Sequence, residues 1–128
     1  YRVKSANADR KVILIATGSE VSLAFECAAR LEADGIGADV VSMVCTQLFD
    51  EQDDAYRADI LPDVAPEQLL RVSIEAGTTF GWDRYTMTHG LRIGIDRFGA
   101  SAPAGDLFEK FGLTADAIVP QIMNKLNG

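Results

Sequence analysis

The sequence predicts an α/β fold, a three-layer α/β/α domain with a five-stranded mixed β-sheet between its helices. The first observation is Val12–Ala16, an unbroken apolar run typical of a parallel strand that is buried on both faces. The second is a set of apolar residues at helical spacing, Val21, Ala24, Phe25, Ala28 and Leu31. The third is another strand-like run, Ala38–Met43. A strand, helix and strand of these lengths almost always form a right-handed parallel unit.

Turn signals mark both ends of this central helix. Thr17 can cap the first free amides, and Glu20 lies where a capping box places its carboxylate. Asp34 and Gly35 end the helix, because glycine accepts the left-handed conformation that follows a last turn. We therefore expect the helix to run between these two signals.

Three more runs complete the predicted sheet. Tyr1–Lys4 alternates like an edge strand. The loop that follows it, Ser5–Arg10, is too short for a parallel crossover, so this strand should run antiparallel to the others. Leu69–Glu75 and Gly90–Ile95 supply the fourth and fifth strands. With strands numbered along the chain, we expect the order 1-3-2-4-5 within a single domain that covers residues 1–128.

Helical segments are expected after the third strand as well. They are Asp50 to about Leu61, Trp82–Met87, Ser101–Phe111 and Ala115 to about Leu126. Asp50 is the expected cap of the first, and the acidic residues after it suit a solvated helix start. Thr114 is the expected cap of the last helix. There, Ile118, Ile122 and Leu126 recur every four residues and predict a buried face.

Composition limits the classes of protein that this chain can represent. It has 128 residues, 48% of them apolar and 24% charged, as expected for one globular domain. The formal net charge of −7 argues against a nucleic-acid partner. No apolar run approaches the ~20 residues that span a bilayer, so we expect a cytoplasmic protein with Cys27 and Cys45 reduced. The chain begins at Tyr1 without methionine, from which we expect a piece of a longer polypeptide.

The predicted strand order places two turns at the same edge of the sheet. A ligand crevice in such a sheet lies beyond the carboxyl ends of strands two and four. The residues there form a candidate small-ligand site: Thr17, Gly18, Ser19, Glu20, Glu75 and Gly77. A helix N-terminus exposes amides that can bind a small anion, although Glu20 would repel one. Glu75 also has a structural alternative, in which it bonds to backbone amides or pairs with Arg84 or Arg97.

The sequence lacks the motifs of common enzyme chemistry. A dinucleotide fingerprint needs three glycines in its first turn, and Gly18 stands alone there. The segment Gly18-Ser19-Glu20 does not fit the esterase nucleophile elbow. His89 is the only histidine, which leaves little room for a nucleophilic triad or a zinc site. We therefore predict no catalytic, cofactor-binding or metal-binding residue in this chain.

Four blocks of the sequence resemble the C-terminal domain of transketolase. They are IATGSEVSLAFECAARLEADGIGADVVSM, FDEQDDAYRADILP, VSIEAGTTFGWDRY and FGASAPAGDLFEKFG, in the family's order and spacing, and the resemblance covers Tyr1 to Leu126. The ATGSEV segment alone also resembles the third domain of deoxyxylulose-phosphate synthase and of the pyruvate dehydrogenase beta subunit. The blocks Phe49–Pro62 and Phe98–Gly112 resemble transketolase itself. Val44 and Cys45 depart from the family, which usually has proline and a small polar residue there.

The resemblance implies the fold derived above and, for a full-length enzyme, transfer of a two-carbon ketol unit between sugar phosphates in the pentose phosphate pathway. It implies a homodimer whose upstream domains bind thiamine diphosphate and a divalent metal, Mg or Ca, with no cofactor bound by this fragment. This domain would pack onto the upstream domains of the same polypeptide and support the dimer. Three interpretations remain: a terminal transketolase domain that is inert when isolated, a stand-alone α/β module that binds a small anion or a protein partner, or the third domain of another thiamine-diphosphate enzyme, deoxyxylulose-phosphate synthase or the pyruvate dehydrogenase beta subunit.

Overall fold

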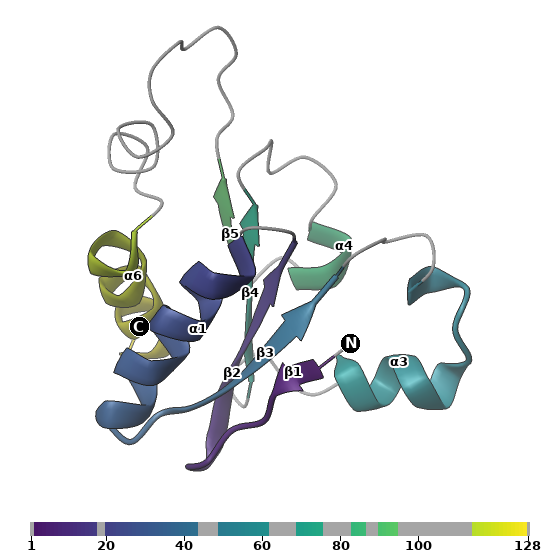
Figure 1. Ribbon diagram of the computed structural model, residues 1–128, viewed down its shortest axis with the longest axis horizontal. Coiled ribbons are helices and arrows are strands. Elements are labelled where there is room, and N and C mark those ends of the chain that lie inside the picture. Colours follow the sequence, from purple (N-terminus) through teal and green to yellow (C-terminus); the bar gives the residue numbers. More distant parts are fainter. Residues whose placement is uncertain are drawn as a thin grey trace, which may run out of the picture.

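The computed structural model describes residues 2–17, 20–43, 49–61, 69–75, 83–86, 90–94 and 114–127. Within them, five strands form one sheet in the order β1-β3-β2-β4-β5 (Figure 1). The strands are β1 Arg2–Lys4, β2 Arg10–Ala16, β3 Gly37–Ser42, β4 Leu70–Glu75 and β5 Leu91–Gly94. β1 is antiparallel to β3, and the other neighbouring strands are parallel. The predicted order and the predicted antiparallel edge are both confirmed.

Helices cover both faces of the sheet. The described helices are α1 Glu20–Ala33, α3 Asp54–Ile60, α4 Asp83–Thr86 and α6 Ala115–Asn127. α1 and α6 lie side by side over one face, whereas α3 lies on the other side of the sheet (Figure 1). None of the helices in the described ranges is long and apolar enough to cross a membrane.

Alternate side chains of β2 enter two separate apolar cores. Val12 and Leu14 face α1 and α6, while Ile13 and Ile15 face the layer that contains Ile60 and Tyr85. All four β2 side chains are completely buried. This explains the unbroken apolar run in the sequence, because successive residues of a strand point to opposite faces and both faces are covered here. β2 therefore lies at the centre of the fold.

The buried face of α1 differs at one residue from the predicted face. Ala24, Ala28 and Leu31 are buried as expected, together with Cys27. Phe25 was expected in this face, and that prediction is wrong because its side chain is 40% exposed. Each helical residue advances by about 100°, so Phe25 lies a full step away from Ala24 and beyond the edge of the buried stripe.

Two helix starts bear on the predicted caps. α1 begins at Glu20, and the Thr17 carbonyl accepts the Glu20 amide at 3.0 Å; because residues 18 and 19 lie outside the described residues, the cap at Thr17 stays a prediction. α3 is capped by Asp53, whose carboxylate accepts the Tyr56 amide at 2.7 Å. The expected cap, Asp50, lies too far upstream for that role, because the helix begins only at Asp54.

The last helix follows its prediction. The Ala117 amide donates to the Thr114 hydroxyl oxygen at 3.3 Å, which satisfies one of the free amides of the first turn of α6. Ile118 and Ile122 are completely buried, and Leu126 packs against the same core. The expected helix over residues 101–111, the histidine at position 89 and the cysteine at position 45 lie outside the described residues.

Candidate functional site

The predicted crevice lies at the carboxyl ends of β2 and β4. Ala16 of β2 pairs with Ile74 of β4, so the next residues along the chain, Thr17 and Glu75, lie at the same edge of the sheet. α1 begins close by at Glu20. The structure thus brings three of the six candidate residues to one edge. The other three, Gly18, Ser19 and Gly77, lie outside the described residues.

Glu20 is an acidic side chain at the described part of this edge. It is only 6% exposed and is held by contacts within the fold. A carboxylate in the first turn of a helix interacts favourably with the positive end of the helix dipole. Glu20 thus carries the negative charge that a small anion would bring to the start of α1, which disfavours an anion there.

The described residues do not supply a metal centre. Within the described ranges, no group of three or more His, Cys, Asp or Glu side chains is placed to hold a metal ion.

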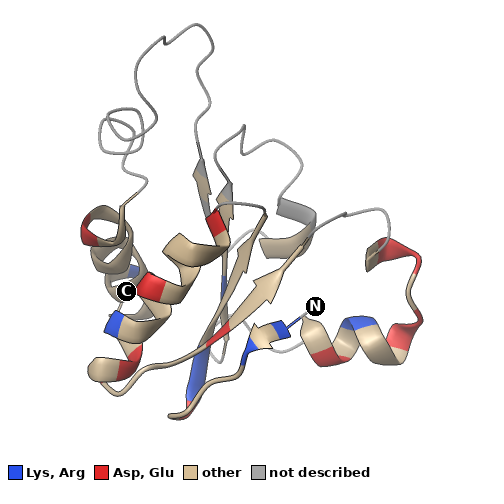
Figure 2. Cartoon of the chain, viewed as in Figure 1, with Lys and Arg blue, Asp and Glu red and all other residues tan. Residues whose placement is uncertain are grey.

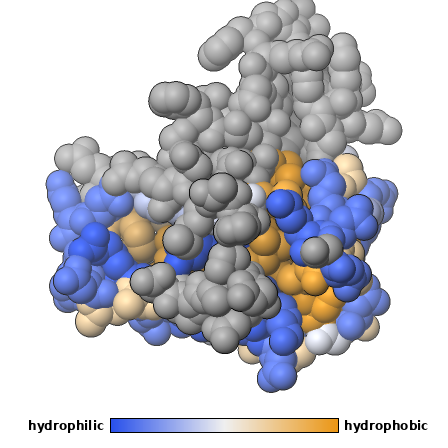
Figure 3. Space-filling model, turned by 180° about the vertical axis from the view of Figure 1, so that it is seen from behind, coloured by the Kyte–Doolittle hydropathy of each residue, from blue (hydrophilic) through white to orange (hydrophobic). Residues whose placement is uncertain are grey.

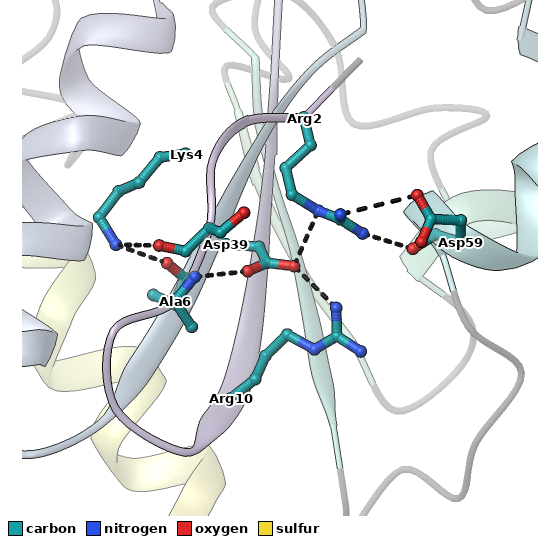
Figure 4. Close-up of polar contacts among 8 residues, drawn as sticks. Arg2, Lys4, Ala6, Arg10, Asp39 and Asp59 are labelled. Carbon is teal, nitrogen blue, oxygen red and sulfur yellow. Dashed lines mark hydrogen bonds and ion pairs between the residues drawn. The ribbon is translucent and has the colours of Figure 1, made fainter.

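A second polar cluster lies around Asp39 of β3, and our sequence reasoning missed it (Figure 4). The Asp39 side chain is 3% exposed, and its carboxylate accepts hydrogen bonds from the Arg10 guanidinium and the Ala6 amide, both at 2.8 Å. The Arg2 guanidinium lies 3.2 Å from the same carboxylate and also pairs with Asp59 of α3. The signal in the sequence was a single aspartate inside an otherwise apolar strand.

Glu32 of α1 extends this cluster. Its carboxylate accepts hydrogen bonds from Lys4 Nζ at 2.9 Å, from the Asn7 amide at 2.7 Å and from the Ala8 amide at 3.1 Å. The Lys4 bond, followed by the two amide bonds, lowers the pKa of Glu32 to about 2. Figure 2 shows these cations at β1 and the start of β2, and acidic residues on and before α3. The cluster joins five elements, β1, β2, β3, α1 and α3, and has the character of a structural network.

Two of the described side chains with nucleophilic groups, Cys27 and Tyr85, are held within the fold. Cys27 is buried, and that burial is the main reason why its pKa is raised to about 12, so the thiol stays protonated near neutral pH. The Tyr85 hydroxyl donates to the Asp50 carboxylate, with both oxygens at 3.2 Å, and its ring packs edge-on against Phe49. Neither side chain has the surroundings of an activated nucleophile or base.

The geometry defines a class of protein: a three-layer α/β/α domain with one antiparallel edge strand and a candidate ligand edge at the carboxyl ends of β2 and β4. A family model described as "Transketolase-like TK C-terminal domain" matches residues 1–114. The chain belongs to this transketolase C-terminal domain family.

Individual relatives agree with the family match. The chain is 46% identical over 127 residues to a transketolase of Sinorhizobium medicae, covering 98% of this chain and 18% of the relative. It is 51% identical over 108 residues to a chloroplastic transketolase of Craterostigma plantagineum, covering 84% of this chain and 20% of the relative.

Solved structures place the same fold in transketolases. The structure of transketolase from Leishmania mexicana superposes with a TM-score of 0.85 at 40% identity, covering 99% of this chain and 18% of that one. A structure described as "Split gene transketolase, inactive beta4 tetramer" superposes with a TM-score of 0.64 at 25% identity, covering 95% of this chain and 41% of that one. The chain thus spans a fifth or less of the curated relatives named above and matches their C-terminal part.

Proposed function

We propose that this chain is the non-catalytic C-terminal domain of an enzyme that transfers a two-carbon ketol group between sugar phosphates. The observation that carries the proposal is the match of nearly the whole chain to the C-terminal part of transketolases. In this proposal, upstream domains of the same polypeptide bind thiamine diphosphate, Mg or Ca, and the sugar phosphates. The pathway is the pentose phosphate pathway, and the enzyme acts in the cytoplasm.

The proposed role of the domain is to pack onto the preceding domains and to support a homodimer. Apolar side chains are partly exposed on β5 and α6, where Leu91, Val119 and Met123 are only partly buried (Figure 3). Surface of this kind is typical of a region that packs against another part of a protein. The split-gene transketolase structure is described as an inactive tetramer, which supports the proposal that such a portion is inactive by itself.

The first test is the size of the natural polypeptide. An antibody raised against the 128-residue chain should detect a band several times larger than 13.8 kDa in a cell lysate. The purified natural protein should then transfer a ketol group from a ketose phosphate to an aldose in a reaction that requires thiamine diphosphate. The 128-residue chain alone should give no transfer. A band near 13.8 kDa with no transferase activity would contradict the proposal and favour a free-standing binding module.

A variant of the natural protein tests the non-catalytic role directly. Replacing Glu20 with glutamine removes the charge at the candidate ligand edge and keeps the shape of the side chain. If the domain is non-catalytic, kcat at saturating thiamine diphosphate should equal that of the wild type. The matched control is Glu26→Gln on the exposed side of the same helix. A large loss of kcat in the Glu20 variant alone would place this domain in the active site.

A second candidate function is a small-ligand site at the same edge. The meeting of the carboxyl ends of β2 and β4 beside the start of α1 favours it. Thermal shifts of the purified protein against a panel of small anions and nucleotides test this idea. A ligand-induced shift that a bulky substitution at Gly18 abolishes, without lowering Tm in the absence of ligand, would support the site. Unchanged Tm values across the panel would count against it.

A further inference from the structure

Residues 2–9, which we call the N-terminal strap, add little to the apolar core. Val3 packs against the core as a partly buried side chain. β1 is three residues long and pairs only at the edge, where Arg2 lies opposite Val41 and Lys4 opposite Val40. The rest of the strap, residues 5–9, forms neither helix nor strand. Its attachment therefore depends on polar contacts more than on buried apolar area.

Two carboxylates of the core accept backbone amides of the strap. Three consecutive strap amides donate to them, at Ala6, Asn7 and Ala8. Asp39 accepts the first amide, and Glu32 accepts the other two. Both carboxylates belong to elements of the main core, Glu32 to α1 and Asp39 to β3.

Cations of the strap bind the same two carboxylates. Lys4 pairs with Glu32 at 2.9 Å, and Arg2 lies 3.2 Å from Asp39 (Figure 4). The strap and its two carboxylates form a connected set of charge-assisted hydrogen bonds, which are stronger than neutral ones. One further backbone bond, from the Gly37 amide to the Asp9 carbonyl at 2.9 Å, joins the end of the strap to β3.

We infer that the N-terminal strap opens as a unit while the sheet core stays folded, and that Glu32 and Asp39 control how often it opens. Proteins open locally where few apolar contacts must be broken, and the strap meets that condition. Opening exposes the β3 edge at Val40 and Val41, which β1 covers in the closed state.

Hydrogen exchange measured by mass spectrometry on the natural polypeptide tests this inference. Amides in peptides covering residues 5–9 should exchange faster than those of β2, the central strand. Glu32→Gln keeps the side-chain shape but removes the charge that three donors share. It should raise strap exchange by about tenfold or more, because glutamine has one acceptor oxygen where Glu32 uses two, so at least one bond is lost and the others become neutral. β2 exchange should stay unchanged.

The matched control is Glu26→Gln, because Glu26 lies on the same helix and pairs with Arg30 instead of the strap. It should leave strap exchange at the wild-type rate. High salt should speed strap exchange in the wild type, since screening weakens partly exposed ion pairs. Asp39→Asn is a second variant, and the salt series on the wild type decides the question even if that variant does not fold. Equal exchange in strap and β2, with an equal response to Glu32→Gln, would overturn the inference.

Discussion

Replacing Gly37 with alanine tests how closely the strap is packed on β3. Gly37 is the buried first residue of β3. A Cβ added at this position would lie 2.4 Å from the carbonyl oxygens of both Ala8 and Asp9. Ordinary van der Waals contact begins at 3.4 Å, so the new methyl would approach about 1 Å too closely (3.4 minus 2.4). Both obstacles are backbone atoms, which cannot rotate away as a side chain can.

The expected loss of stability follows from that overlap. Overpacking of a tight site costs roughly 1–3 kcal/mol, and we expect Gly37→Ala near 2–3 kcal/mol because backbone on the strap must move. Gly35→Ala is the comparison variant. It lies two positions earlier in the sequence, and its expected loss of stability comes from backbone strain instead of overpacking. Gly35 has φ +79° and no atom within 4 Å of the place that an alanine methyl would occupy, so only the left-handed backbone is strained. That strain costs about 1 kcal/mol.

Urea unfolding of the purified protein measures both variants, with the midpoint reporting stability and the slope reporting the surface exposed. Gly37→Ala should lower the midpoint more than Gly35→Ala does. It should also speed hydrogen exchange in the strap, whereas Gly35→Ala should not. If Gly37→Ala is as stable as the wild type, or no worse than Gly35→Ala, then the strap does not pack on Gly37 as the structure indicates.

Three further predictions concern the polar network and the buried thiol. The Glu32 pKa is lowered from 4.5 to about 2. The contribution of Glu32 to stability is therefore complete above pH 4.5 and is lost as the pH falls through about 2. Urea midpoints followed from pH 6 to pH 2 should show this loss in the wild type and not in Glu32→Gln. Asp39→Ala should cost about 2–4 kcal/mol, because it removes the acceptor of the Ala6 amide and of the Arg10 guanidinium and leaves Arg2 paired only with Asp59; a double-mutant cycle with Arg10→Ala should show coupling between the Asp39 and Arg10 side chains. In a Cys45→Ser variant, Cys27 should react with a thiol reagent at pH 8 far more slowly than an exposed thiol does, because the pKa of Cys27 is about 12. Rapid reaction in the folded protein would contradict a buried, protonated thiol.

The sheet could be predicted from the sequence because its signals are local. β2 contains an unbroken apolar run and β1 has the alternating pattern of an edge strand, and the length of each connection decides whether the next strand can be parallel. The loop after β1 was too short for a parallel crossover, and the antiparallel pairing of β1 with β3 agrees with that reasoning. The last helix was equally predictable from the sequence, because Thr114 caps it and Ile118 and Ile122 recur at helical spacing, and both signals are local.

Details that depend on exact angle or register were not predictable in the same way. Phe25 fitted a helical apolar face by spacing, but the stripe is centred on Ala24, Cys27 and Leu31, and a shift of one residue moves a side chain about 100° around the helix. Asp50 and Asp53 are equally good caps by residue type. The choice follows from the place where α3 begins, and Asp50 instead accepts the Tyr85 hydroxyl.

The candidate site shows the same division between local and long-range information. Topology alone brought Thr17 and Glu75 to one edge, because parallel strands end together. The Asp39 cluster required knowing that β1, β2 and β3 meet in register, since its partners Arg2 and Arg10 come from different strands. A charged residue inside an apolar strand is costly without a partner, so Asp39 could have been singled out as a residue that needs one. The strand pairing decides which cations pair with Asp39. For this reason the network that holds the strap could be identified only in the structure.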